Sequence, residues 1–251
     1  MPRPFIVFDI ETTLDKEAAA RAFKVCPEDA EALKAAVGDF PKTPFHRIVA
    51  IAATTLTYDA FYKRWSVREM ATLHTNGGDD GDLVRQFLQY LHGTAPIVVS
   101  YNGGTFDLPV VRARAMLHRI SAPALASEPF RPFSRDHLDL CDLFWGRGRD
   151  RMTLDQSARV FGVGAKTQGI DGSKVDEFAD AGRFDTIAAY CLDDVVITTG
   201  MFLLYQAWQG IFAIDGLENA MTSLRQVRDH IVATKPTVFV RDSPMPLVPE
   251  L

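Results

Sequence analysis

The chain has 251 residues, of which 47% are hydrophobic and 24% are charged, and its formal net charge is −5. This composition indicates a globular protein that buries a substantial core. The acidic balance argues against a protein that coats nucleic acid nonspecifically, but it is compatible with an enzyme that grips a few nucleotides locally.

Cysteine usage and apolar runs indicate the compartment. The cysteines Cys26, Cys141 and Cys191 are far apart and form no metal-ligand pair, so neither a disulfide framework nor a zinc knuckle is indicated. The apolar run at the N-terminus is too short for a signal peptide, and we expect no stretch of the ~18 apolar residues that a membrane span needs. We therefore expect a cytoplasmic protein without a membrane partner.

The first half of the chain contains strands, a helical segment and a hairpin. Residues 5–12 read as a strand that is apolar on both faces and therefore central in a sheet. Residues 15–45 are rich in Ala and Glu and are helical in character. Residues 47–58 and 61–70 are predicted to pair as a hairpin, and the apolar spacing within 83–91 predicts a helix that ends near Gly93.

The second half is mostly helical. A short buried strand at 95–101 precedes a helix that begins near Asp107, and Thr153 is the expected N-cap of a helix at 153–162. The segment 136–145 is ambiguous. Residues 183–208 carry the longest helical pattern, and another helix is expected at about 216–233. The order of elements predicts an α/β or α+β domain with a mixed sheet.

The strand at 5–12 ends in two carboxylates. Asp9 and Glu11 are two residues apart, and side chains at that spacing project from the same face of a strand. Ligand sites in open sheets tend to lie at such strand ends. The alternative is that the strand has simply reached solvent.

Three further residues change this balance. Asp107 follows the glycines of "YNGGTFD", where a strand meets a helix, and it is either a helix cap or a ligand. Tyr190 and Asp194 are four residues apart on one face of an otherwise apolar helix. Tyr190 alone would read as a core aromatic, and we expect Asp193 to lie where the helix surface reaches solvent.

If Asp9, Glu11, Asp107 and Asp194 converge, their charges repel. At an effective dielectric constant near 20, two carboxylates about 4 Å apart repel by roughly 4 kcal/mol. Protons or cations must relieve this repulsion. A site made of carboxylates suits Mg²⁺ or Mn²⁺ better than zinc.

The motifs "FDIET", "YNGGTFDLPVV" and "YCLDDVVIT" resemble, in this order, the three exonuclease motifs of the DEDD 3′–5′ exonucleases. The resemblance is closest to the exonuclease domain of family B DNA polymerases and to the stand-alone predicted exonucleases related to it, a link strengthened by "GAKTQGIDGSKV" at 164–175. It covers roughly residues 4–210. Because Tyr190 lies four residues before Asp194, and Ala189 stands where another subclass has histidine, the chain resembles the tyrosine subclass.

The resemblance implies an RNase H-like α/β fold, with a mixed five-stranded sheet and helices on both faces. We expect this domain at 1–210, with 15–45 as a helical insertion, and a C-terminal helical extension and tail at 211–251.

The resemblance also implies two Mg²⁺ or Mn²⁺ ions. Asp9 would bridge both ions, while Glu11 and Asp194 would hold the ion that carries the attacking water. Asp107 would help to hold the second ion. Tyr190 would orient the water, since its unperturbed pKa near 10 favours orientation over proton removal.

The implied activity is metal-dependent 3′–5′ hydrolysis of DNA, on single-stranded ends, releasing nucleoside 5′-monophosphates, with repair of DNA ends suggested by analogy alone. One alternative is a 3′–5′ exoribonuclease. Another is a non-catalytic module that binds nucleic acid or a protein partner. The oligomeric state is left open.

Several residues outside the acidic motifs are candidates for substrate contacts. Phe106 either stacks on a terminal base or packs in the core, and the arginines of "WGRGRDRM" either follow a strand backbone or lie in a solvated loop. The basic segment "RARAMLHR" at 112–119 is expected to form a surface face. The candidate substrate-binding residues are Thr12, Asn102, Phe106, Arg147, Arg149 and Lys166.

Overall fold

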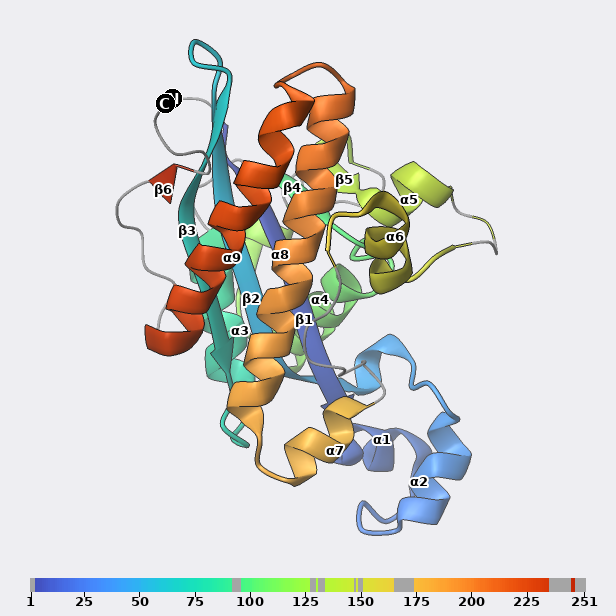
Figure 1. Ribbon diagram of the computed structural model, residues 1–251. Coiled ribbons are helices and arrows are strands. Elements are labelled where there is room, and N and C mark those ends of the chain that lie inside the picture. Colours follow the sequence, from blue (N-terminus) through green and yellow to red (C-terminus); the bar gives the residue numbers. More distant parts are fainter. Residues whose placement is uncertain are drawn as a thin grey trace.

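The computed structural model describes residues 3–91, 96–126, 130, 134–146, 148, 151–164, 174–234 and 245–246. Its strands form one mixed sheet in the order β5-β4-β1-β2-β3-β6 (Figure 1). The strands are β1 (Phe5–Leu14), β2 (His46–Asp59), β3 (Arg64–His74), β4 (Ile97–Ser100), β5 (His137–Asp139) and β6 (Met245–Pro246).

The expected mixed sheet is confirmed, with β1–β5 as its five expected strands and β6 as one further short strand. β1 is central because it pairs antiparallel with β2 on one side and parallel with β4 on the other. β2 and β3 form the expected hairpin, and β5 lies parallel to β4 at one edge. The two-residue β6 adds to the outer side of β3.

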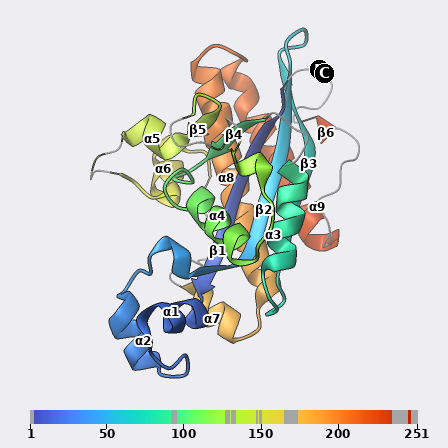
Figure 2. The same ribbon diagram turned by 180° about the vertical axis from the view of Figure 1, so that it is seen from behind.

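Helices cover both faces of the sheet, as expected. In Figure 1 α8 and α9 lie over one face, and Figure 2 shows α3 and α4 on the other. The helices are α1 (Lys16–Phe23), α2 (Ala30–Val37), α3 (Gly81–Leu91), α4 (Asp107–Leu117), α5 (Leu140–Trp145), α6 (Leu154–Phe161), α7 (Val175–Asp180), α8 (Phe184–Trp208) and α9 (Leu217–Thr234). Three short 3₁₀ helices complete the described elements: η1 (Thr43–Phe45), η2 (Pro123–Ala126) and η5 (Ile214–Gly216).

The run of apolar residues in β1 reflects its burial on both sides. Ile6, Phe8 and Ile10 pack in the core under α3 and α4, whereas Val7 packs in the core under α8. Successive strand residues alternate between faces, so a strand with helices on both faces must be apolar throughout. Asp9 and Glu11 are the charged residues of this strand.

α8 corrects one expectation from the sequence. By length and composition alone, this helix could cross a membrane, but 94% of its most apolar stretch is buried inside the protein. Its neighbours pack very closely: a Cβ at Gly200 would lie 2.6 Å from Val163 Cγ1 and 2.5 Å from Met221 Sδ. α8 therefore has the burial of a core helix between the sheet and α9.

The sequence predicted that Asp193 lies where the surface of α8 reaches solvent, and this prediction is wrong. Its side chain is buried, and Arg228 of α9 donates to its Oδ1 from Nε at 2.6 Å. The spacing of apolar residues along α8 could not reveal this pair, because its partner comes from a different helix.

The basic segment 112–119 is not simply a surface face, because Arg114 is only 2% exposed. Its guanidinium donates to Asp80 Oδ2 at 2.7 Å and to Asp80 Oδ1 at 2.6 Å. It also donates to Asp15, whose other oxygen caps α1 by accepting from Ala18 N at 2.8 Å. This charge network ties the segment after β1 to α3 and α4.

Residues 15–45 form two helices, as their composition predicts. Ala19, Ala20 and Leu33 form a small core of their own between α1 and α2. Thr153 caps α6, as expected, whereas the ambiguous segment 136–145 contains both β5 and α5.

Candidate active site

Asp9 and Glu11 lie on the face of β1 that packs towards α8. Their partners across the strand pair are Ala52 and Ala50 of β2, whose small side chains leave room on this face. The register shifts just after Glu11, between Glu11 and Thr12. Such an irregularity bends the strand and redirects the side chains that follow, and it is common beside active sites.

Cys191 of α8 contacts Asp9 of β1. Its thiol donates to the carbonyl oxygen of Asp9 at 3.3 Å and lies 3.6 Å from Asp9 Oδ2. Single ligand atoms of Asp9, Glu11 and Cys191 all lie within 4.8 Å of one another, so this group could hold a metal ion. Cys191 has no second cysteine at ligand spacing, so its sequence position gave no signal of this contact.

Asp107 reaches the same corner from the first residue of α4. Its Oδ1 accepts from the backbone N–H of Ile10, between the two acids of β1, at 3.2 Å. A Cβ on Gly103 would lie 2.7 Å from Ser100 Oγ and 3.2 Å from Asp107 Oδ2. The glycine of the second motif is therefore needed for the close approach of this turn to Asp107.

The turn before α4 is held by Asp139, a residue outside the three motifs. Asn102 has a φ of 68°, and its N–H donates to Asp139 Oδ1 at 2.8 Å. Gly104 N–H donates to Asp139 Oδ2 at 2.9 Å, and Asp139 Oδ1 also accepts from Cys141 N at 3.1 Å as the cap of α5. An aspartate directly before an apolar helical run was the available sequence signal.

The electrostatics of the corner reflect an excess of negative charge. Burial raises the pKa of Asp107 to about 7, and the charges of Asp139 and Asp194 act in the same direction. Burial also raises the pKa of Tyr190, to which the charges of Asp194, Glu11 and Asp9 contribute. The structure thus brings together the five motif residues, which we call the acidic site: Asp9, Glu11, Asp107, Tyr190 and Asp194.

A cavity of about 390 Å³ opens beside the acidic site. Asp9, Asp194, Asn102 and Arg151 are among its lining residues. Arg151 is held in place because its Nη2 donates to Asp142 Oδ1 at 2.7 Å. The cavity therefore places a cationic side chain and the acids around one space.

The remaining candidate residues divide into two groups. Thr12 follows Glu11 and bonds His46 Nδ1 at 2.9 Å, Asn102 lines the cavity, and the ring of Phe106 lies against that of His46. Three candidates lie outside the described residues, and their role stays a prediction: Arg147, Arg149 and Lys166.

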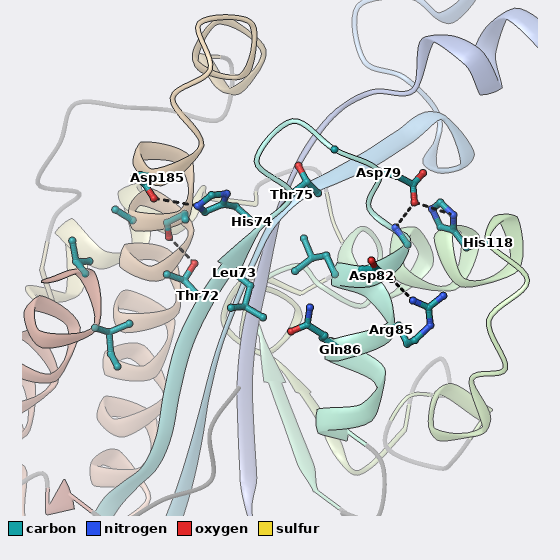
Figure 3. A pocket seen from close by; sticks show the side chains of 17 residues that line it. Thr72, Leu73, His74, Thr75, Asp79, Asp82, Arg85, Gln86, His118 and Asp185 are labelled. Atoms are coloured by element: carbon teal, nitrogen blue, oxygen red, sulfur yellow. Dashed lines mark hydrogen bonds and ion pairs between the residues drawn. The ribbon is translucent and has the colours of Figure 1, made fainter. Parts of the chain in front are cut away.

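A larger cavity, of about 730 Å³, lies elsewhere, between β3, α3 and the start of α8. Figure 3 shows that some of its polar side chains pair with one another, with His74 on Asp185 and His118 on Asp79. Among the described residues that line it, none belongs to the acidic site. Size alone therefore does not identify the chemistry of a cavity in this protein.

The pKa of Asp107 predicts a pH-dependent stability in EDTA. The folded chain keeps a proton on Asp107 up to about pH 7, whereas the ordinary value is 3.8. The unfolded chain releases that proton first, so the free energy of unfolding should fall as the pH rises from about 4 through 7, by on the order of 4 kcal/mol from this group. Urea unfolding of the wild type and Asp107→Asn measures the difference.

Between about pH 4 and 7, we expect the free energy of unfolding of the wild type to fall relative to that of Asp107→Asn. The exposed Asp82→Asn variant is the control and should keep the wild-type slope. Equal slopes in wild type and Asp107→Asn would contradict the account.

Most of the chain matches a known protein family. Residues 38–240, more than half of the chain, match a family described as predicted 3′–5′ exonucleases related to the exonuclease domain of PolB. The chain belongs to this family. No curated protein matches the chain.

The fold of this family member resembles that of a solved family B DNA polymerase. The family B DNA polymerase of the hyperthermophilic archaeon Pyrobaculum calidifontis is 20% identical, with a TM-score of 0.55 over 91% of this chain and 27% of the polymerase. The zinc-bound complex of Escherichia coli exonuclease I with single-stranded DNA is 14% identical, with a TM-score of 0.44 over 84% of this chain and 42% of that protein. The chain therefore spans about a quarter of the polymerase and less than half of exonuclease I.

Proposed function

We propose that this family member is a metal-dependent 3′–5′ exonuclease. It would hydrolyse the last phosphodiester bond at 3′ ends of DNA, preferably single-stranded, and release nucleoside 5′-monophosphates. The observation that carries the proposal is the acidic site, in which four carboxylates and a tyrosine from β1, α4 and α8 meet beside one cavity. These residues are the ones that the three exonuclease motifs supply.

The residues present fit Mg²⁺ or Mn²⁺. The donors are carboxylate oxygens, which these hard cations prefer. Burial is the main cause of the raised pKa of Asp107, and the charges of Asp139 and Asp194, which cations would offset, raise it further. Asp9, Glu11, Asp107 and Asp194 would hold two such ions. When bound, the pair would supply Lewis acidity that lowers the pKa of a water and stabilises the leaving 3′-oxygen.

Tyr190 would orient the attacking water. Its buried phenol has a raised pKa in the field of the acids, so it keeps its proton at neutral pH. A protonated phenol can donate a hydrogen bond to a water or to a phosphate oxygen, but it cannot act as the general base. This role agrees with its position on α8 one turn before Asp194.

The cavity beside the acidic site supports a strand end as substrate. Its volume of about 390 Å³ suits a small ligand or a single nucleotide better than the end of a duplex. Arg151 lines this cavity, and its guanidinium would bind a backbone phosphate through a bidentate pair of hydrogen bonds. Arg147 and Arg149 lie outside the described residues and stay predicted contacts to the strand backbone.

A time course on oligonucleotides tests the function. The protein is incubated with DNA labelled at the 5′ end or at the 3′ end, in Mg²⁺, Mn²⁺ or EDTA. We expect immediate release of labelled mononucleotide from the 3′ label, a ladder of shortening products from the 5′ label, and no product in EDTA.

The same assay on RNA and on duplex DNA tests the substrate. Faster degradation of RNA would replace the DNA assignment by an exoribonuclease. No release from any substrate with either metal would refute the enzymatic proposal and favour a binding module.

A further inference from the structure

An exposed aromatic side chain, Phe40, contacts Phe106 of the second motif from a segment that the three motifs do not include. Phe40 is 72% exposed. It lies in the connection between α2 and β2, two residues after Gly38, whose φ of 76° ends α2. A phenylalanine exposed to this extent gains little from core packing, so its position calls for another explanation.

Phe40 belongs to a cluster of three rings. Its centroid lies 5.8 Å from that of Phe106 and 5.2 Å from that of His46. The rings of His46 and Phe106 meet edge to face at 4.9 Å, with an interplanar angle of 86°. We call Phe40, His46 and Phe106 the aromatic cluster.

Hydrogen bonds attach the aromatic cluster to the first motif. His46 Nε2 faces the carbonyl oxygen of Pro41 at 2.9 Å, and a carbonyl only accepts, so Nε2 carries the proton. His46 Nδ1 must then accept, and Thr12 Oγ1 donates to it at 2.9 Å. These two hydrogen bonds link Pro41, the residue after Phe40, to Thr12 through His46. Thr12 in turn directly follows Glu11, a candidate metal ligand.

The second motif fixes the other side of the aromatic cluster. Phe106 immediately precedes Asp107, and its backbone N–H donates to Asn102 O at 3.2 Å. The aromatic cluster is therefore connected to the chain directly beside two candidate metal-binding acids, through Phe106 before Asp107 and through Thr12 after Glu11. Sequence-tolerant binding of single strands relies on aromatic rings stacked on bases beside the backbone contacts.

We propose that Phe40, supported by His46 and Phe106, stacks on the base of the 3′-terminal nucleotide and so selects strand ends that carry a base. The proposal rests on the exonuclease function above and names the part of the substrate that this segment recognises. His46 acts as a positioning residue, since it holds the segment through Thr12 and Pro41.

Binding in EDTA tests the proposal separately from catalysis. Dissociation constants are measured by fluorescence anisotropy for two 5′-labelled DNA oligomers, one ending in thymidine and one ending in an abasic residue. Wild type should bind the thymidine end on the order of 10-fold more tightly than the abasic end. Phe40→Ala should lose this preference, and Phe40→Trp should retain it.

The matched control is Phe61→Ala. Phe61 is 86% exposed in the turn that joins β2 and β3, at the far end of β2 from His46, and its replacement should leave the preference unchanged. A third oligomer is abasic only at the penultimate position. The ratio of its dissociation constants for Phe40→Ala and wild type should equal the ratio for the intact oligomer.

Three results would overturn the proposal. These are an unchanged preference in Phe40→Ala, an equal loss of affinity for both ends, and a preference that follows the penultimate base. If wild type binds with the expected preference but releases no nucleotide with Mg²⁺ or Mn²⁺, the exonuclease assignment fails and the base contact stands. If wild type binds neither oligomer but releases nucleotides with Mg²⁺, the base contact fails and the exonuclease assignment stands.

Discussion

Asp9→Asn and Asp194→Asn should each reduce the metal-dependent release of nucleotides by at least about a thousandfold, because each removes a carboxylate that would hold the catalytic cations. Both residues line the cavity beside the acidic site. An amide keeps the shape of the side chain but has lost the negative charge. The measurement is the initial rate on a 3′-labelled oligomer at saturating Mg²⁺.

The same variants should fold as well as the wild type or better in EDTA, since each relieves repulsion among clustered acids. Thermal unfolding checks this point. Asp82→Asn, an exposed acid on α3, is the matched control and should keep wild-type activity. Activity of Asp9→Asn or Asp194→Asn within a few fold of wild type would refute the assigned roles.

Arg114→Met should destabilise the protein by about 3–5 kcal/mol, because it leaves a buried carboxylate without its partner. Asp80 is 0% exposed and accepts two bonds from Arg114. For a chain of this size the loss corresponds to a decrease in Tm of roughly 10 °C. Differential scanning calorimetry measures it, with Arg85→Met as control, whose surface pair with Asp82 contributes at most about 1 kcal/mol.

The pH dependence identifies the mechanism of this loss. Burial alone would raise the pKa of Asp80, but the bonds and charge of Arg114, with the N–H of Ile48 and the ring of His118, lower it below the ordinary value. This stabilisation is present above pH 4 and is lost as the pH falls through the lowered pKa. The difference between wild type and Arg114→Met should therefore shrink in acid, and a difference that stays constant would contradict the account.

The sequence predicted the elements with strong local patterns. The β1 strand, the hairpin and α8 carry long apolar repeats, and burial of both faces of β1 explains why its pattern does not alternate. β5 has three residues, too few for any periodicity, and it was left within an ambiguous segment. The three motifs predicted that their acids lie close together, because each motif ends a strand or lies on a helix that packs on the sheet.

Partners across the fold could not be predicted in the same way. Helical spacing assigned Arg114 and Asp193 to surfaces, yet both side chains are buried and each pairs with an opposite charge from another part of the chain. Such pairs depend on tertiary packing, which local spacing does not encode. The aromatic cluster is similar, since Phe40 acquires its neighbours from β2 and from the second motif only in the folded chain.

The central claim is that the acidic site holds divalent cations, and anomalous scattering from Mn²⁺ in crystals of the protein tests it most directly. The account predicts two anomalous peaks among the carboxylates of Asp9, Glu11, Asp107 and Asp194, and their loss in crystals of Asp9→Asn. Strong Mn²⁺ peaks only at other acids, with none at this corner of β1 and α8, would contradict it.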